Sequence, residues 1–271
     1  HLRHLAQRVG GLKEIMSSPP LQAAISVRGA AKTFEDGTRA LDGVTFEIPR
    51  AQFVSVLGPS GCGKSTLLRM MGGLYPPDQG GEVHVLGRQQ VTPSPDVGIV
   101  FQTHNMLPWL TVEGNIRLAA EIRGIGETEI AERAEKILDV LKLTPFRKSH
   151  PHQLSGGMRQ RAAFGQILIL RPQVLLLDEP FGALDALTRD QLNVELLRIW
   201  QQEQQTVILI THSISEAVFL SDRILVMSDR PGRIVADIAI EFPYPRDPQI
   251  TRALPQFTEH VLALNRMMGV V

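Results

Sequence analysis

The sequence predicts an α/β fold: a parallel core sheet, an N-terminal antiparallel β subdomain and an inserted α-helical subdomain. Three observations predict it. Strand-like and helical segments alternate after residue 155, which is typical of a parallel sheet with helices on both faces. Residues 24–48 alternate apolar and polar side chains, which indicates a half-exposed antiparallel sheet. Residues 103–155 show helical periodicity with no strand-like run between the helices.

The chain of 271 residues divides into three expected parts. Residues 1–20 form an N-terminal extension that fits either a basic interfacial helix or a loosely docked segment. Residues 21–242 form one domain, with the helical subdomain inserted at about 103–155. Residues 243–271 form a proline-rich linker and one terminal helix over Gln249–Met268.

The individual elements follow from periodicity and from turn residues. Antiparallel strands are expected at Ile25–Arg28 and Val44–Ile48, with a turn at Glu35–Thr38, and a further strand is expected at Glu82–Gly87. Val97–Phe101 is apolar throughout and is therefore expected at the centre of the parallel sheet. Its other strands are expected at Phe53–Leu57, Val174–Leu177, Thr206–Ile210, Arg223–Met227 and Ile234–Ile240. Helices are expected behind Thr66 to about Gly72 and over Thr111–Ile122, Glu127–Leu143, Gly156–Leu170, 186–203 and Ser213–Leu220.

Composition excludes several classes of function. Basic and acidic residues number 28 each, so no basic surplus favours a nucleic-acid partner, and none is expected. The single cysteine, Cys62, cannot form an intramolecular disulfide, which fits a reducing cytosolic setting. A membrane span needs roughly 18 consecutive apolar residues. No such stretch exists, so a protein acting at a membrane would need a partner to supply the span.

A phosphate-binding motif, G-x-x-x-x-G-K-[ST], lies between an apolar strand and a helix. Its glycines let successive N–H groups point at an anion, and the helix N-terminus adds partial positive charge. Lys64 is expected to reach the β- and γ-phosphates, and the Ser65 hydroxyl to bind Mg²⁺. The residues of the motif are Gly58, Pro59, Ser60, Gly61, Cys62, Gly63, Lys64, Ser65 and Thr66.

Polar side chains follow three of the predicted parallel strands, at the sheet edge where ligands bind in such folds. Asp178 is expected to contact Mg²⁺ beside Ser65, and Glu179 to polarise the water that attacks the γ-phosphate. His212 could hold that water and the γ-phosphate, or could be a surface histidine; position alone does not decide. Gln102 could contact Mg²⁺ or the water, and on its own it is a weak signal.

A second anion site is predicted at Ser155-Gly156-Gly157, where a helix begins. A capped helix start is the simpler interpretation of these three residues alone. The segment lies at the far end of the helical insertion from the phosphate loop. Two copies of the chain arranged head to tail would place this segment of one copy over the nucleotide of the other.

Taken together, these motifs resemble the nucleotide-binding subunit of an ATP-binding cassette (ABC) transporter over about residues 24–230. The resemblance implies ATP and Mg²⁺ as cofactors and assigns catalytic roles to Lys64, Gln102, Glu179 and His212. Phe34 lies where the family stacks an aromatic ring on adenine. Met158 departs from the commoner glutamine of the family's signature. The matches are Gly58–Thr66 (Walker A), Gln102 (Q-loop), Leu154–Gln160 (signature), Val174–Pro180 (Walker B), Ala183–Asp185 (D-loop) and His212 (switch).

Three further segments resemble the importer ATPases for nitrate, sulfonate, taurine and related small compounds: Leu107–Val112, Phe181–Asp185 and Ser228–Ile234. The resemblance implies a homodimer that closes around two ATP molecules. It also implies membrane-spanning permease subunits, an indirect link to a periplasmic or extracellular solute-binding protein, and a peripheral location on the cytoplasmic face of the inner membrane. Trp109 is expected either to contact the permease or to pack in the helical core.

Two competing functions are a soluble ABC ATPase that acts on nucleic acid or ribosomes and an importer ATPase for another class of solute. A non-enzymatic nucleotide-gated scaffold is a third, which the joint presence of Lys64, Glu179 and His212 disfavours. The first class usually has two cassettes in one chain or a long coiled-coil insertion, and neither pattern is seen here. The sequence therefore favours ATP hydrolysis coupled to solute import.

Overall fold

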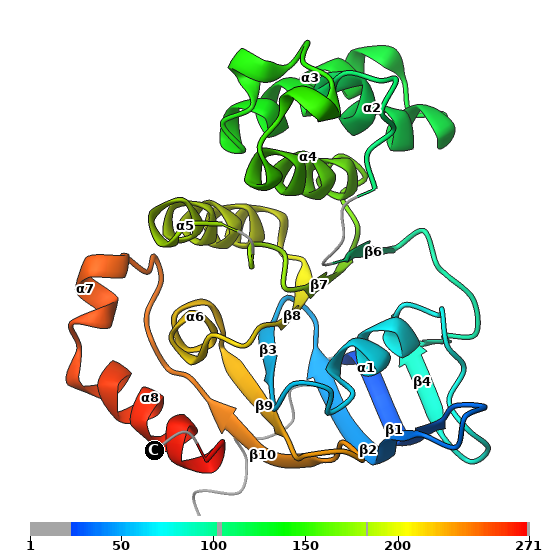
Figure 1. Cartoon of the computed structure of the whole chain (residues 1–271), viewed down its shortest axis with the longest axis vertical. Helices are drawn as coiled ribbons and strands as arrows, with labels where there is room; N and C mark the ends of the chain where they lie inside the picture. Colours follow the sequence, from blue (N-terminus) through cyan, green and yellow to red (C-terminus); the bar gives the residue numbers. More distant parts are fainter. Residues whose placement is uncertain (1–22, 102–104, 183, 270–271) are drawn as a thin grey trace, which may run out of the picture.

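The computed structural model describes residues 23–101, 105–182 and 184–269. Figure 1 shows two sheets in the lower part of the molecule and a layer of helices above them. The expected fold class is confirmed. The Gln102 prediction, one residue of the D-loop match (Ala183) and the N-terminal extension lie outside the described residues.

The smaller sheet is antiparallel, in the order β2-β1-β4-β5. Strands β1 and β2 pair antiparallel, with Ile25 opposite Ile48 and Val27 opposite Phe46. Their inward side chains are buried while the alternating ones are exposed, which is the pattern that the sequence predicted. The strands are β1 (Ala23–Thr33), β2 (Arg39–Pro49), β4 (Glu82–Val85) and β5 (Arg88–Gln89).

The larger sheet has the order β10-β9-β3-β8-β7-β6, with all neighbours parallel except β10 and β9. Its strands are nearly all apolar because both faces are covered. One face, with Val54, Val56 and Leu176, packs toward α1 and the smaller sheet. The strands are β3 (Phe53–Leu57), β6 (Val97–Val100), β7 (Val174–Asp178), β8 (Thr206–Ile210), β9 (Arg223–Met227) and β10 (Ile234–Ala239).

The prediction that Val97–Phe101 is a central strand is wrong, because β6 lies at the edge of the sheet. Its apolar character comes from helices on both faces. Gly98 lies so close to Ile167 of α4 that a Cβ there would be 2.5 Å from that side chain, and Ile99 packs against the end of α1 at Gly72. The apolar sequence of β6 therefore indicates that helices cover both of its faces, and it does not indicate a central place in the sheet.

Helices α2 and α3 pack together above the larger sheet, with α4 beneath them (Figure 1). Their buried positions follow helical periodicity, as in Ile130, Ala134 and Leu138 of α3. The helices are α1 (Lys64–Met71), α2 (Val112–Ile122), α3 (Glu127–Val140), α4 (Gly156–Leu168), α5 (Ala186–Glu203) and α6 (Ile214–Leu220), with short 3-10 turns at Thr144–Phe146 and Pro151–Gln153.

The prediction of one terminal helix over Gln249–Met268 is also wrong. The structure has two helices there, α7 (Pro248–Arg252) and α8 (Pro255–Met267). Pro255 has no backbone N–H and cannot continue a preceding helix, but it is well suited to the first position of a new one. Within the described residues, no helix is long and apolar enough to cross a membrane.

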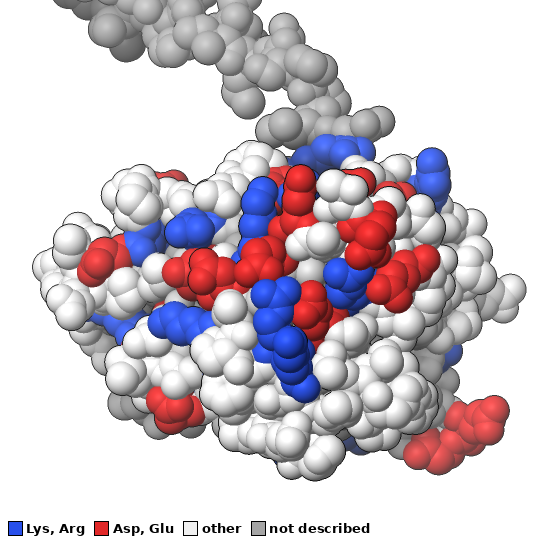
Figure 2. Space-filling model, turned by 90° about the horizontal axis from the view of Figure 1, so that it is seen from above, with Lys and Arg blue, Asp and Glu red and all other residues white. Residues whose placement is uncertain are grey.

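The helical end of the molecule carries charges of both signs (Figure 2). Arg147 donates from its Nε and Nη2 to both carboxylate oxygens of Glu113, each at 2.9 Å, and its Nη1 lies 2.9 Å from Glu135. Arg117 likewise forms ion pairs with two carboxylates, those of Glu121 and Glu127. Positive and negative side chains thus alternate on this face and offset one another.

Candidate nucleotide site

A pocket of about 590 Å³ opens at the carboxyl ends of β3, β7 and β8. It brings together the phosphate loop, the turn between β1 and β2, the ends of two parallel strands and the loop after β9. This is the sheet edge where the sequence placed the site. The lining residues are Phe34, Thr38, Ala40, Gly58, Ser60, Gly61, Gly63, Lys64, Ser65, Thr66, Asp178, Glu179, Ile210, His212 and Arg230.

Glycine is required in the phosphate loop for two separate reasons. Gly61 and Gly63 have φ angles of +74° and +108°, which side chains rarely adopt. In addition, a Cβ on Gly63 would lie 2.6 Å from the backbone oxygen of Ala40. The loop therefore presses directly against the start of β2, and α1 begins immediately behind Gly63.

Lys64 is held by its own loop. Its ammonium donates to the carbonyls of Gly58 at 2.7 Å and Pro59 at 2.8 Å, and the side chain is almost fully buried. The Cys62 sulfur lies 3.9 Å from the same ammonium, beneath the loop. The positive charge of Lys64 thus lies at the floor of the pocket, where it can bind a phosphate.

Ser65 and Asp178 meet as predicted. The Ser65 hydroxyl donates to Asp178 Oδ1 at 3.2 Å. Burial raises the pKa of Asp178, while the hydrogen bond from Ser65 and the charge of Arg69 oppose the rise. Asp178 thus offers a buried carboxylate beside a hydroxyl, and oxygen donors of this kind suit a divalent cation.

Glu179 and His212 also converge. Strands β7 and β8 are neighbours, with Asp178 opposite Ile210, so the residues that follow both strands emerge side by side. His212 Nδ1 lies 3.3 Å from Glu179 Oε2. The backbone of Glu179 has φ +49° and donates its N–H to the carbonyl of Ile210 at 3.0 Å, and Glu179 lines the pocket together with Asp178.

A buried polar network supports the loop that carries His212, and the sequence motifs did not predict it. Glu216 accepts hydrogen bonds from Asn193 Nδ2 at 3.0 Å and from the Thr211 hydroxyl. Thr211 in turn accepts from the backbone N–H of Ser213 at 3.0 Å. Asn193, Glu216 and Thr211 are all buried, so their hydrogen bonds hold the backbone on each side of His212 in place.

Arg230 is a further residue that sequence reasoning did not assign to the site. It comes from the loop after β9, and its Nε donates to the carbonyl of Gly61 at 3.0 Å. The rest of the exposed guanidinium lines the pocket. It also lies near enough to Asp36, in the turn beside Phe34, to lower that residue's pKa slightly, after the larger effect of hydrogen bonds from Thr38.

Phe34 lines the pocket as predicted and packs edge-on against Tyr75, with ring centroids 5.8 Å apart. Ser155, Gly156 and Gly157 do not line it. Ser155 caps α4 by accepting a hydrogen bond from Met158 N–H at 3.2 Å, and Gly156 faces open space. A single chain therefore brings most of the described site residues to one pocket. The exceptions are the Ser-Gly-Gly segment and also Pro59 and Cys62, which belong to the phosphate loop but do not line the pocket.

Trp109 is 69% exposed, so the interpretation of it as a core aromatic is wrong. It lies in the segment that leads from β6 to α2, in the helical part of the molecule.

Comparisons with known proteins agree with this geometry. The sequence model of the family described as ABC transporter matches residues 41–182. An uncharacterized ABC transporter ATP-binding protein of Methanocaldococcus jannaschii is 44% identical over 86% of this chain and 88% of its own length. An aliphatic sulfonates import ATP-binding protein, SsuB of Bacillus cereus, is 44% identical over 82% of this chain and 88% of its own length.

Among solved structures, a dimeric ATP-binding cassette in a post-hydrolysis state, bound to ADP and Pi, is 30% identical with a TM-score of 0.72. It covers 81% of this chain and 100% of the matched chain. The family match spans the phosphate loop, and both the fold and the pocket agree with it. The chain belongs to the ABC transporter family, and it is an ATP-binding cassette that hydrolyses ATP.

Proposed function

We propose that this protein is the ATP-hydrolysing subunit of an importer for a small organic anion of the aliphatic sulfonate class. The observation that carries the proposal is the pocket in which Lys64, Asp178, Glu179 and His212 meet at one sheet edge. The 44% identity to relatives named as aliphatic sulfonates import proteins supports the solute class.

In the proposed site, the loop Gly58–Thr66 surrounds the phosphates of ATP with backbone N–H groups. Lys64 exchanges its two carbonyl partners for β- and γ-phosphate oxygens. Phe34 offers a ring face to the adenine. Arg230 adds a second cation beside the phosphate loop, because its Nε lies 3.0 Å from the carbonyl oxygen of Gly61.

Mg²⁺ fits the oxygen donors that are present. The Ser65 hydroxyl and the Asp178 carboxylate lie 3.2 Å apart, and hydroxyl and carboxylate oxygens suit this cation. When bound, Mg²⁺ neutralises charge that develops on the phosphate oxygens. On the basis of sequence, Gln102 is proposed as a further contact to the cation or the water.

Glu179 is the proposed general base. Its carboxylate faces the pocket beside His212, which orients the attacking water and donates a hydrogen bond toward the γ-phosphate. The network of Asn193, Glu216 and Thr211 holds the His212 loop in place, so the pair need not reorganise during the reaction.

We further propose that two copies assemble head to tail. Ser155, Gly156 and Gly157 are outside the pocket of their own chain, and they form a helix start at which Ser155 and Gly156 are exposed, the kind of place where anions bind. In the dimer they close over the γ-phosphate of the other copy. ATP then favours the closed arrangement because it makes contacts there that the open one lacks.

The import assignment adds permease subunits that span the membrane, with the ATPase bound peripherally at their cytoplasmic side and a solute-binding protein on the other side. Trp109, exposed on the helical part, is proposed to contact the permease. Retention of the protein on membranes should require co-expression of the permease. A Trp109→Ala variant that keeps full association and transport would remove this contact from the proposal.

The test of the hydrolytic site is Glu179→Gln. We expect ATP affinity to stay unchanged, the turnover rate to fall at least about 100-fold, and an ATP-dependent dimer to accumulate on gel filtration. Glu132→Gln is the matched control, since Glu132 is exposed on α3 and forms no ion pair within the described residues. Wild-type turnover in Glu179→Gln would refute the assignment of the base.

A further inference from the structure

One face of helix α4 packs against the segment that follows β7. A Cβ on Gly157 would lie only 2.3 Å from the Leu184 side chain, so helix and segment are in direct contact there. The rings of Phe164 and Phe181 meet edge to face, with their centroids 5.5 Å apart. Gln160 comes three residues after Gly157 and four before Phe164, so it lies on the same face of the helix.

Gln160 contacts the backbone of Glu179 from this face. Its side chain is buried, and its Nε2 donates to the carbonyl oxygen of Glu179 at 3.2 Å. The same oxygen accepts the N–H of Gly182 at 3.2 Å. On the other side, the N–H of Glu179 donates to the carbonyl of Ile210 at 3.0 Å. Hydrogen bonds therefore fix the peptide groups on both sides of the Glu179 Cα.

The backbone of Glu179 needs such support. Its φ of +49° lies in the left-handed region, which a residue with a Cβ adopts only where its surroundings hold it there. The backbone conformation also sets the direction in which the side chain leaves the Cα. In this conformation Glu179 Oε2 lies 3.3 Å from His212 Nδ1. The bonds that hold the backbone thus also help to hold the carboxylate beside His212.

Stability alone does not explain an amide at position 160. The Oε1 of Gln160 is buried and forms no hydrogen bond with any described residue, which is unfavourable for folding. The carbonyl of Glu179 would keep its bond from Gly182 if the Gln160 amide were removed. An apolar side chain of the same length would therefore serve the fold about as well. What the amide adds is its contact with Glu179.

We propose that Gln160 is a positioning residue for ATP hydrolysis. Its N–H₂ group holds the backbone of Glu179 in the left-handed conformation, so that the carboxylate stays beside His212. Gln160 does not line the nucleotide pocket, and it acts through Glu179 alone. The inference rests on the proposed role of Glu179 as the general base.

The experiment is steady-state ATP hydrolysis by the whole protein with Gln160→Met. Methionine is unbranched and of similar length, and it has no N–H to donate. We expect kcat to fall about tenfold while the KM for ATP stays unchanged, because Gln160 contacts the base and not the nucleotide. Gln160→Leu is a second variant without the donor and should lose kcat in the same way.

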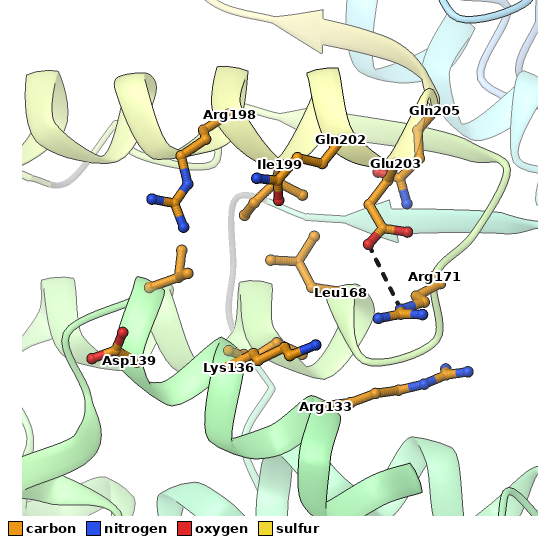
Figure 3. A pocket seen from close by; sticks show the side chains of 12 residues that line it. Arg133, Lys136, Asp139, Leu168, Arg171, Arg198, Ile199, Gln202, Glu203 and Gln205 are labelled. Atoms are coloured by element: carbon orange, nitrogen blue, oxygen red, sulfur yellow. Dashed lines mark ion pairs between the residues drawn. The ribbon is translucent and has the colours of Figure 1, made fainter.

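The matched control is Gln205→Met. Gln205 is likewise buried, and its Oε1 also forms no hydrogen bond with the described residues. Figure 3 shows it just beyond α5, beside a cavity of about 340 Å³ that shares no lining residue with the nucleotide pocket. We expect Gln205→Met to keep the wild-type kcat, and thermal unfolding of the two methionine variants to agree.

A double variant separates positioning from a general structural role. Gln160→Met is added to Glu179→Gln, and the residual turnover is measured with radiolabelled ATP. If Gln160 acts through the Glu179 carboxylate, the added substitution should change that residual rate less than twofold, or about 0.4 kcal/mol. A structural role would lower the rate by the same factor in both backgrounds.

Three results would overturn the proposal: wild-type kcat in Gln160→Met, a raised KM with unchanged kcat, or an equal loss in the two backgrounds. Wild-type turnover in Glu179→Gln would instead overturn the proposed base itself. The failure of one inference is thus distinguishable from the failure of the other.

Discussion

Gly63→Ala tests the contact between the phosphate loop and strand β2. The substitution adds one methyl group at a backbone φ of +108°, and that group would lie 2.6 Å from the carbonyl oxygen of Ala40 and 2.8 Å from the Leu41 side chain. Leu41 can move, but the Ala40 oxygen belongs to the backbone of a paired strand. The loop or the strand must therefore shift.

The expected magnitude has two contributions. A left-handed backbone costs a residue with a Cβ about 1–2 kcal/mol. Forcing a methyl group into filled space costs about 1–3 kcal/mol more. Gly80→Ala isolates the first contribution, since Gly80 has φ +92° and nothing would lie within 4 Å of its Cβ. The entropy that alanine removes from the unfolded chain is common to both and cancels in the comparison.

The assay is urea unfolding of the two variants beside the wild type. Gly63→Ala should lose about 1–3 kcal/mol more than Gly80→Ala, and it should also weaken ATP binding because Lys64 follows directly. Equal losses in the two variants, within about 0.5 kcal/mol, would show that the loop does not press against β2 as described.

Three further predictions concern other contacts. Arg230→Gln should weaken ATP binding about tenfold with little change in turnover, as fluorescence titration and steady-state kinetics would show; unchanged affinity would exclude a phosphate contact. Glu216→Gln should lower turnover with little effect on ATP affinity, since it loosens the backbone around His212; a loss of affinity instead would point to general unfolding of the site. Arg147 holds the pKa of Glu113 below its usual range, so this pair stabilises the fold above the unfolded glutamate pKa and the contribution is lost as pH falls through the lower, folded pKa. Glu113→Gln should therefore cost up to about 1 kcal/mol at neutral pH and nothing in strong acid; a pH-independent loss in denaturant titrations would contradict the ion-pair explanation.

The sequence predicted the meeting of Glu179 and His212 because each residue follows a strand of the same parallel sheet. Glu179 and His212 each follow an apolar strand, and parallel neighbours present their ends at one edge, so the 3.3 Å approach follows once β7 and β8 are adjacent. Position along the chain left the role of His212 undecided, and its place beside Glu179 supports the role proposed above.

The residues that were missed depend on tertiary structure. Arg230 reaches Gly61 from a loop about 170 positions away. The segment Ser228–Ile234 was noted only for its resemblance to importer ATPases, which did not place Arg230 at the phosphate loop. Glu216 and Asn193 resemble ordinary polar helix residues until α5 and α6 pack and bury them together. The edge position of β6 escaped prediction for a similar reason, since burial by α1 and α4 gives an edge strand the composition of a central one.

The hydrogen bonds of Lys64 to the carbonyls of Gly58 and Pro59 have a consequence for the enthalpy of ligand binding. The loop's own carbonyls accept hydrogen bonds from this buried cation, so phosphate oxygens would have to replace those carbonyls as its partners. The heat released on binding therefore measures a difference between phosphate and carbonyl oxygens. A weak ligand such as a lone phosphate gains little from that exchange, whereas a triphosphate gains at several oxygens together. We therefore expect the loop to favour ligands with several phosphates over a single phosphate.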